Sequence, residues 1–497
     1  MGVHCIQREK TVWNYVTIDS INVTKTIENA EHLLKKEKGL SPAMQAMLQT
    51  LLLIIKLLCD RLNLNSSNSS KPPSSDPNRA KPNRPKSKNP PGGQKGHKGT
   101  TLKPFENPDV IKVIPVEQEI LPSGQYQDAG YLARQEVNIK ISREVTEYRA
   151  QILVNKNGRQ FIAPFPPGLN RPIQYGPSLK SHAVYLSAFQ LIPYERIQNQ
   201  FQDQYNINIS TGSINNFNCE AAKRLEDFKK VAINQLILSS LGHADETSVN
   251  IDGKKHWLHG FSNEHWAWLY VHKKRGTEAM NEIGILPHFK GILCHDHWKS
   301  YYKYDCTHSL CNAHHSRELT RAWEQDNQKW AQKMDALLQE VNVETKKAGG
   351  ELPSNRADDW QTKYLQILEE AEAECPPPEE PPPEKKKRGR IKRSKARNLL
   401  ERLRDFREDV LRFMKNKIVP FTNNLGEREI RMIKVQQKIS GCFRSLDGAR
   451  NHCIIRSYIL TCQKNGIGAT EALDTLFQGR LPEFIQKLVD QLPAEAE

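Results

Sequence analysis

Three acidic residues, far apart in the chain, have the side-chain type and the surroundings that suit metal-dependent cleavage of a nucleic-acid backbone. Asp245 and Asp296 end or interrupt short apolar, strand-like runs, and Glu427 opens a strongly basic helix. Phosphodiester hydrolysis and transfer need an in-line oxygen nucleophile and stabilisation of the leaving oxygen, and two divalent ions held by carboxylates supply both. Because Mg²⁺ prefers oxygen ligands, these three residues are candidate catalytic residues and ligands of Mg²⁺ or Mn²⁺.

Each of these acids also has an ordinary interpretation. An Asp at a strand end is most often a surface or capping residue, so the hypothesis rests on the three residues together. Their separations are 296 − 245 = 51 and 427 − 296 = 131 residues. The second separation is unusually long for one compact domain, and a helical insertion would account for it.

The helix that begins near Glu427 carries a basic stripe. Asn423 and Asn424 can cap it, and Glu427 is followed at helical spacing by cations that would contact DNA phosphates. The cations expected to bind DNA are Arg428, Arg431, Lys434 and Lys438 on this helix, together with Lys95 and Lys98 nearer the N-terminus. An exposed helix with internal salt bridges would show the same spacing.

A second group of metal-ligand types runs from Cys306 to His315. Its spacing matches no standard zinc pattern, and half of it falls on an expected buried strand, where Cys behaves as a small hydrophobic residue. The structural interpretation is therefore favoured. His314 could still lie beside the acids and orient a phosphate or a water molecule, with Asn424 as a second supporting residue. Trp298 and Tyr301 are expected in the core near the second acid.

The expected elements place the first two acids on one sheet. Runs at 244–251, 255–261 and 267–271, separated by Asp252-Gly253 and Ser262-Asn263, predict an antiparallel meander. A helix at 277–285, strands at 291–294 and 309–311, and helices over 318–372 follow. This order is typical of a ribonuclease-H-like α/β domain, in which the strands bearing Asp245 and Asp296 are neighbours.

The N-terminal half contains three further kinds of segment. Ser41-Pro42 predicts a helix start, and apolar residues then alternate four and three apart in a short coiled-coil-like seam. Val137–Ile141 and Tyr148–Val154 alternate as strands of a small β-rich module. Helices around Ile197–Tyr205 and from Ser210 onward are compatible with a helix-turn-helix DNA reader, although helical hairpins that bind no DNA are commoner.

Composition limits the classes of function. The 497 residues hold 72 Lys+Arg against 57 Asp+Glu, a net charge of +15, which favours a polyanionic partner. Ten scattered cysteines favour a reducing cytoplasm over a disulfide-stapled secreted protein. The N-terminus lacks the apolar core of a signal peptide. The longest apolar run, Leu51–Ile55, is far shorter than the roughly 20 residues that span a membrane, so no transmembrane segment is expected.

Long, ordered motifs identify a resemblance. They are Asn68–Asp76, Gly92–His97, Pro172–Pro177, Asp245–Thr247, Lys255–His259, Phe289–Asp296, Leu310–His314 with Arg317–Leu319, Asn423-Asn424 with Glu427-Arg428, and Gln437–Ser445. Over most of its length the chain resembles the DDE-type transposases of the insertion sequence 66 family. The resemblance implies a ribonuclease-H-like core, Asp245, Asp296 and Glu427 as the metal-binding triad, and cleavage and joining of the ends of a mobile genetic element. It also implies double-stranded DNA, a homo-oligomer and small accessory proteins of the same element as partners, in the nucleoid-associated cytoplasm of a bacterium.

The chain departs from this family in three places. Members usually carry a cysteine zinc site before Tyr175, but no Cys lies between Cys59 and Cys219, so no zinc is expected there. Thr422 stands where the family has Asp. The first residues, 1 to about 37, do not resemble the family. Two other functions therefore stay open: a DNA-binding protein that no longer transposes, and a ribonuclease-H-like nuclease without strand transfer.

The expected fold class is a multidomain α+β protein with a ribonuclease-H-like core, preceded by helical and small β-rich DNA-binding modules. The expected divisions are an N-terminal helical or coiled-coil region (1–64), a basic disordered linker (65–103), a small β-rich module (104–172), a helix-turn-helix-like region (173–235), a catalytic domain (236–465) with an insertion at about 318–420, and a C-terminal helical tail (466–497). A low-complexity tract, Pro376–Arg397, lies inside the insertion.

Overall fold

The computed structural model describes residues 17–18, 21–37, 39–62, 64–65, 68–69, 102–117, 119, 121–378 and 393–492. Lys95, Lys98 and most of the expected linker lie outside these residues. The chain divides into two compact units. The first comprises Met1–Ala80, Leu169–Asn199 and Ile209–Glu497, and the second comprises Lys81–Gly168 and Gln200–Asn208. Helices and a mixed sheet occur together, so the expected α+β class is confirmed.

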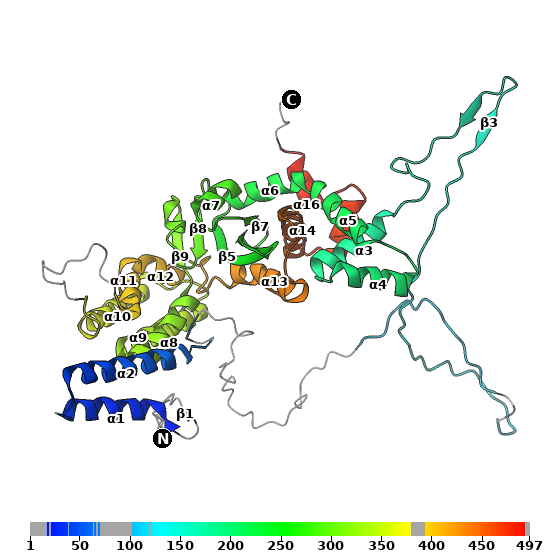
Figure 1. Ribbon diagram of the computed structural model, residues 1–497. Coiled ribbons are helices and arrows are strands. Elements are labelled where there is room, and N and C mark those ends of the chain that lie inside the picture. Colours follow the sequence, from blue (N-terminus) through cyan, green and yellow to red (C-terminus); the bar gives the residue numbers. More distant parts are fainter. Residues whose placement is uncertain are drawn as a thin grey trace. The chain divides into compact units, whose positions relative to one another are not determined.

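A five-stranded mixed sheet lies at the centre of the first unit (Figure 1). In spatial order its strands are β7 (Ala267–His272), β6 (Lys254–Ser262), β5 (Leu241–Ile251), β8 (Ile292–His295) and β9 (Thr307–Leu310). The first three pair antiparallel, whereas β8 pairs parallel with both β5 and β9. The expected meander and the two later strands are therefore confirmed, with α7 (Thr277–Ile283) between them in the chain.

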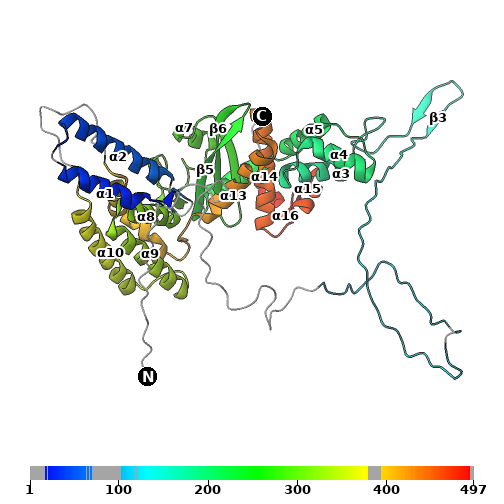
Figure 2. The same cartoon turned by 60° about the horizontal axis from the view of Figure 1, so that its bottom comes forward.

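Two helices pack on one face of this sheet (Figure 2). The helix α13 (Asn424–Ser440) contacts β5 and β6, and α14 (Leu446–Lys464) contacts β7. Apolar side chains of both layers form one buried cluster, in which Leu258 and Leu269 meet Ile430 and Ile433. Gly260 permits the close approach, because a Cβ there would lie 2.7 Å from Cγ2 of Ile430. The sheet thus fixes where α13 begins.

A helical insertion separates β9 from α13. It consists of α8 (Asn312–Asp326), α9 (Lys329–Lys347), α10 (Ser354–Glu374), α11 (Lys395–Asp405) and α12 (Arg407–Lys415). These helices bury a hydrophobic core that includes Trp330 and Tyr364 and extends to Leu310 of β9. The expected helical insertion is confirmed. Residues 379–392 of the low-complexity tract lie outside the described residues, and α11 begins inside the end of that tract.

A helix near the N-terminus begins where the sequence predicts one, at Ser41-Pro42. Short strands β1 (Thr17–Ile18) and β2 (Ile21–Asn22) precede α1 (Val23–Lys36) and α2 (Pro42–Leu62). The Met44 N–H donates to Ser41 Oγ at 3.3 Å, so the cap is confirmed. The apolar seam of α2 is largely exposed, at Met44, Leu51, Ile55, Leu58 and Leu62. Among the described helices, α2 is the one with enough length and hydropathy to cross a membrane, and the expectation of no membrane segment stays a prediction.

Further helices of the first unit surround the sheet ends. They are α3 (Pro177–Val184), a π-helix (Tyr185–Phe189), α4 (Tyr194–Tyr205, which continues into the second unit), α5 (Thr211–Lys223), α6 (Glu226–Ile237), α15 (Ala469–Phe477) and α16 (Glu483–Val489). Ser210 Oγ caps α5 by accepting from the Ser213 N–H at 3.0 Å. Both helices of the expected pair are confirmed, and DNA reading by them stays a prediction.

The second unit has less strand than expected. Its hairpin pairs β3 (Ile152–Val154) with β4 (Gln160–Ile162), but Val137–Ile141 forms no strand, so that prediction is wrong. Alternation of apolar and polar residues favours a strand only where a second layer of the protein buries the apolar face of that strand. Ile139 instead remains 88% exposed, because no described neighbour covers it.

The contact between α13 and the sheet can be tested at Gly260. We expect Gly260→Ala to lower the free energy of unfolding by about 1–3 kcal/mol, since the added methyl group overlaps Ile430 in a closely packed layer. Urea denaturation measures the change. Gly276→Ala is the matched control, because a Cβ there meets no atom within 4 Å. Equal effects of the two substitutions would contradict this packing.

Candidate active site

Asp245 and Asp296 lie at the same level of two neighbouring parallel strands. The register of β5 and β8 pairs Leu241 with Ile292 and His243 with Cys294. Asp245 lies two residues after His243, within β5, and Asp296 lies two residues after Cys294, directly after the end of β8. The structure therefore brings together the two aspartates that the sequence singled out.

Glu427 enters the same region from the first turn of α13, where Asn423 holds the helix start against the sheet. Asn423 Nδ2 donates to the Ala244 carbonyl at 2.8 Å, and its Oδ1 lies 2.8 Å from His243 Nδ1. Its backbone N–H donates to Cys311 Sγ at 3.1 Å. Asn423 occupies the N-cap position, but its side chain makes no cap hydrogen bond. The expected capping role is therefore wrong for Asn423, whose side chain anchors the helix to β5.

The pKa of Asp245 reflects its acidic surroundings. Burial raises this pKa well above its usual value, and the negative charges of Glu246, Asp296 and Glu427 raise it further, whereas the Glu246 N–H lowers it. So much acidic charge around one carboxylate is unfavourable unless a cation or a proton offsets it. The all-oxygen set of Asp245, Asp296 and Glu427 suits a hard divalent cation such as Mg²⁺.

Glu246 belongs to a group that the sequence did not reveal. Its buried carboxylate pairs with Arg275 at 2.5 Å and accepts a hydrogen bond from the Tyr301 hydroxyl. The Arg275 guanidinium also lies 4.2 Å from the centre of a Trp298 ring. The backbone N–H of Trp298 donates to Asp296 Oδ1 at 3.0 Å. Arg275 thus ties β5 to the turn that holds Asp296. Sequence spacing gave no signal for it, because Arg275 lies in the loop after β7, away from every motif.

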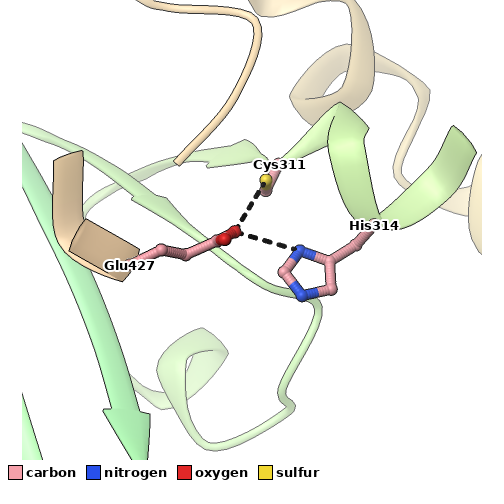
Figure 3. Close-up of side chains that lie close together, drawn as sticks. All are labelled: Cys311, His314 and Glu427. Carbon is pink, nitrogen blue, oxygen red and sulfur yellow. Dashed lines mark hydrogen bonds and ion pairs between the residues drawn. The ribbon is translucent and has the colours of Figure 1, made fainter. Parts of the chain in front are cut away.

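The cysteine and histidine group from Cys306 to His315 divides into two places. Cys306 Sγ lies 4.0 Å from His308 Nε2, and His308 contacts His295. Cys311 and His314 instead face Glu427 from the start of α8 (Figure 3). Glu427 Oε1 lies 3.7 Å from Cys311 Sγ and also 3.7 Å from His314 Nδ1. His314 therefore lies beside Glu427, and its role in orienting a phosphate or a water molecule stays a prediction.

The basic residues of α13 differ in their surroundings. Arg428, Arg431 and Lys438 are exposed, as phosphate contacts would require. The Lys434 ammonium donates to the backbone and hydroxyl oxygens of Ser248, so part of its hydrogen-bonding capacity is used within the protein. Asn424 is exposed at the first turn. DNA contact by any of these side chains stays a prediction.

Comparison with known proteins gives two family matches. The family model described as Transposase IS66 family matches residues 172–451, more than half of the chain. A family of unknown function, DUF6444, matches residues 20–103, so part of the N-terminal stretch that did not resemble transposases has its own family. No curated protein matches the chain. The first match covers the sheet, the insertion, all of α13 and the first residues of α14.

The anchoring role of Asn423 can be tested by truncation. We expect Asn423→Ala to lower the free energy of unfolding by about 1–3 kcal/mol, because the buried Ala244 carbonyl and the His243 ring lose a partner. Denaturant titration measures the change. Asn424→Ala, at the exposed neighbouring position, should change stability by no more than about 0.5 kcal/mol. A similar loss in both variants would argue against a specific anchor.

Proposed function

The chain belongs to the IS66 transposase family, and we propose that it binds the ends of an insertion sequence, cleaves phosphodiester bonds there and joins the freed 3′-hydroxyl ends to target DNA. In the first step a water oxygen attacks phosphorus and the 3′-oxygen leaves. In the second step that 3′-hydroxyl attacks a phosphodiester of the target, which releases a target 3′-hydroxyl. One catalytic site can serve both steps, since each replaces one P–O bond by another.

The observation that carries the proposal is the shared level of Asp245 and Asp296 on β5 and β8, with Glu427 near enough to raise the pKa of Asp245. Two features support a ribonuclease-H-like core: the strand order β7-β6-β5-β8-β9, and the change from antiparallel to parallel pairing at β5. In such a sheet, carboxylates on the two central parallel strands converge with one from a packed helix. The positions of Asp245 within β5, of Asp296 directly after β8 and of Glu427 on α13 support this assignment.

Asp245, Asp296 and Glu427 would hold two divalent ions, Mg²⁺ or Mn²⁺. When bound, such ions lower the pKa of the attacking water and stabilise the charge on the leaving oxygen. The donor set fits them, because all three side chains offer carboxylate oxygens, the ligands that such ions prefer, and Asp245 and Asp296 lie at the same level of neighbouring strands. Asn423 and Arg275 act as positioning residues: the first fixes the helix that carries Glu427, and the second fixes the turn that carries Asp296.

DNA is the proposed partner of the exposed cations on α13. Arg428, Arg431 and Lys438 follow Glu427 on this helix, so phosphates bound by them would lie next to the carboxylates. We also propose a second copy of the chain as a partner through the exposed apolar seam of α2. Accessory proteins of the same element and a bacterial cytoplasmic location complete the proposal.

Two other functions make different predictions. A DNA-binding protein derived from a transposase would bind element ends without cutting them. A nuclease without strand transfer would cut them without joining. The complete triad favours an enzyme over the first alternative, and the family match favours transposition over the second.

The proposal can be tested with DNA ends that flank the gene. We expect wild-type protein with Mg²⁺ to cleave them and to join them to target DNA, and Asp296→Asn to lower both rates by at least about a hundredfold, because a charged metal ligand is lost. Gel assays of cleavage and joining measure the rates. A mobility-shift assay should give similar DNA affinity for both proteins.

Lys273→Ala, an exposed residue in the loop beside Arg275, is the control for nonspecific loss of charge. An Asp296→Asn protein as active as wild type would overturn the triad assignment. Binding of ends without any cutting by the wild type would support the DNA-binding alternative, and cutting without joining would support the nuclease.

A further inference from the structure

We propose that Cys311, His314 and Glu427 form a separate site for a borderline-soft divalent cation of the zinc class. Loading this site would inhibit strand cleavage by withdrawing Glu427 from the catalytic carboxylates. The binding site stands on the geometry of three side chains, while the inhibition rests on the proposed function. Neither the family match nor the triad assigns such a site.

The first support is the convergence of three different ligand types. The Sγ, imidazole nitrogen and carboxylate oxygen all lie within 4.8 Å of one another, and they point toward each other from β9's end, α8 and α13 (Figure 3). A tetrahedral Zn²⁺ with ligand distances of about 2.0–2.3 Å places its ligand atoms roughly 3.3–3.6 Å apart. The two measured separations from Glu427 Oε1 are 3.7 Å. A contraction of a few tenths of an ångström would therefore suffice for these two separations, and the sulfur-to-nitrogen separation is within 4.8 Å.

The second support is an unpartnered nitrogen. His314 Nδ1 is buried and has no hydrogen-bond partner among the described residues, although it lies 3.7 Å from Glu427. Buried polar atoms are normally hydrogen-bonded. In the tautomer with its proton on Nε2, this nitrogen has a free lone pair directed at a carboxylate and a sulfur, which is the arrangement of a metal ligand.

The third support is the rigid setting of the sulfur. Cys311 is 1% exposed and occupies the N-cap position of α8, three residues before His314. Its backbone N–H donates to the His295 carbonyl at 2.9 Å, and its sulfur accepts the Asn423 N–H at 3.1 Å. Strand pairing and the Asn423 anchor thus hold this ligand in place before any ion binds, which reduces the ordering cost of binding.

The ligand chemistry separates this site from the proposed catalytic one. Thiolate and imidazole favour Zn²⁺ and related ions, whereas Mg²⁺ favours oxygen ligands alone. Three protein ligands leave a fourth tetrahedral position for water. Glu427 is common to both sets, and its carboxylate cannot adopt both geometries at once. Zinc-class and magnesium-class ions would therefore compete through one residue.

The test uses the full-length chain, freed of metal and titrated with Co²⁺, which reports thiolate ligation by a sulfur-to-cobalt charge-transfer band. We expect one equivalent of Co²⁺ to give this band and one equivalent of Zn²⁺ to remove it. Cys311→Ser keeps a hydrogen-bond acceptor for Asn423 and should abolish the band. His314→Ala, at a partly exposed position, should weaken Zn²⁺ binding by about tenfold or more, since even changes outside the ligand set cost about 10–100-fold.

Two controls locate the ion. Cys306→Ser, the matched substitution in the neighbouring group, and Asp296→Asn, in the proposed triad, should both keep the band. A missing band in the wild type, a band that survives in Cys311→Ser, or a band lost in either control would overturn the site.

The inhibition has its own readout. One equivalent of Zn²⁺ should suppress Mg²⁺-dependent cleavage by the wild type more strongly than cleavage by His314→Ala, each compared with its own zinc-free rate. Equal suppression of both would overturn the inhibitory role. If the wild type never cleaves DNA, the cobalt titration still decides the metal site, so failure of the proposed function is distinguishable from failure of this inference.

Discussion

The hydrogen bonds made by Asn423 are the contacts on which the site depends. This one buried residue bonds to the backbone of β5, to the His243 ring and to the sulfur that follows β9. It joins three segments that are far apart in the chain, and it does so at the first residue before α13. Without such a link, repulsion among Asp245, Asp296 and Glu427 would favour a helix start further from the sheet.

Packing reinforces the same placement from two residues that lie further along the helix. Ile430 sits over Gly260, and Ile433 joins the cluster formed by Leu258 and Leu269. The apolar contacts set the height and direction of α13, while the hydrogen bonds set its rotation and starting point. Glu427 lies between these two constraints, so the backbone that carries it is held beside the sheet, while its side chain can still turn toward either set of ligands.

Much of this arrangement could be predicted from the sequence, because its signals are local. Alternating strands with Asp252-Gly253 at a turn gave the meander, and the apolar runs before Asp296 and Cys311 gave β8 and β9. Other features are set by tertiary contacts. The strand expected at Val137–Ile141 is absent, because alternation of apolar and polar residues does not by itself supply a second layer to cover the apolar side. Arg275 was missed because its partners come from β5 and from the turn after β8. The anchoring role of Asn423 was mistaken for capping, because the sequence shows its place before a helix but not the carbonyl it reaches.

The insertion between β9 and α13 enters and leaves the sheet domain at nearly one point. The Asn312 N–H donates to the Phe421 carbonyl at 3.1 Å, and its side chain donates to the Val410 carbonyl at 3.0 Å. The helices between these points share one buried core, which also includes Leu310 of β9. Because entry and exit are already held together, the entropy of chain closure rises only slowly with the length of polypeptide between them. Lineages could lengthen, shorten or exchange this segment at little conformational cost to the junction that presents Glu427.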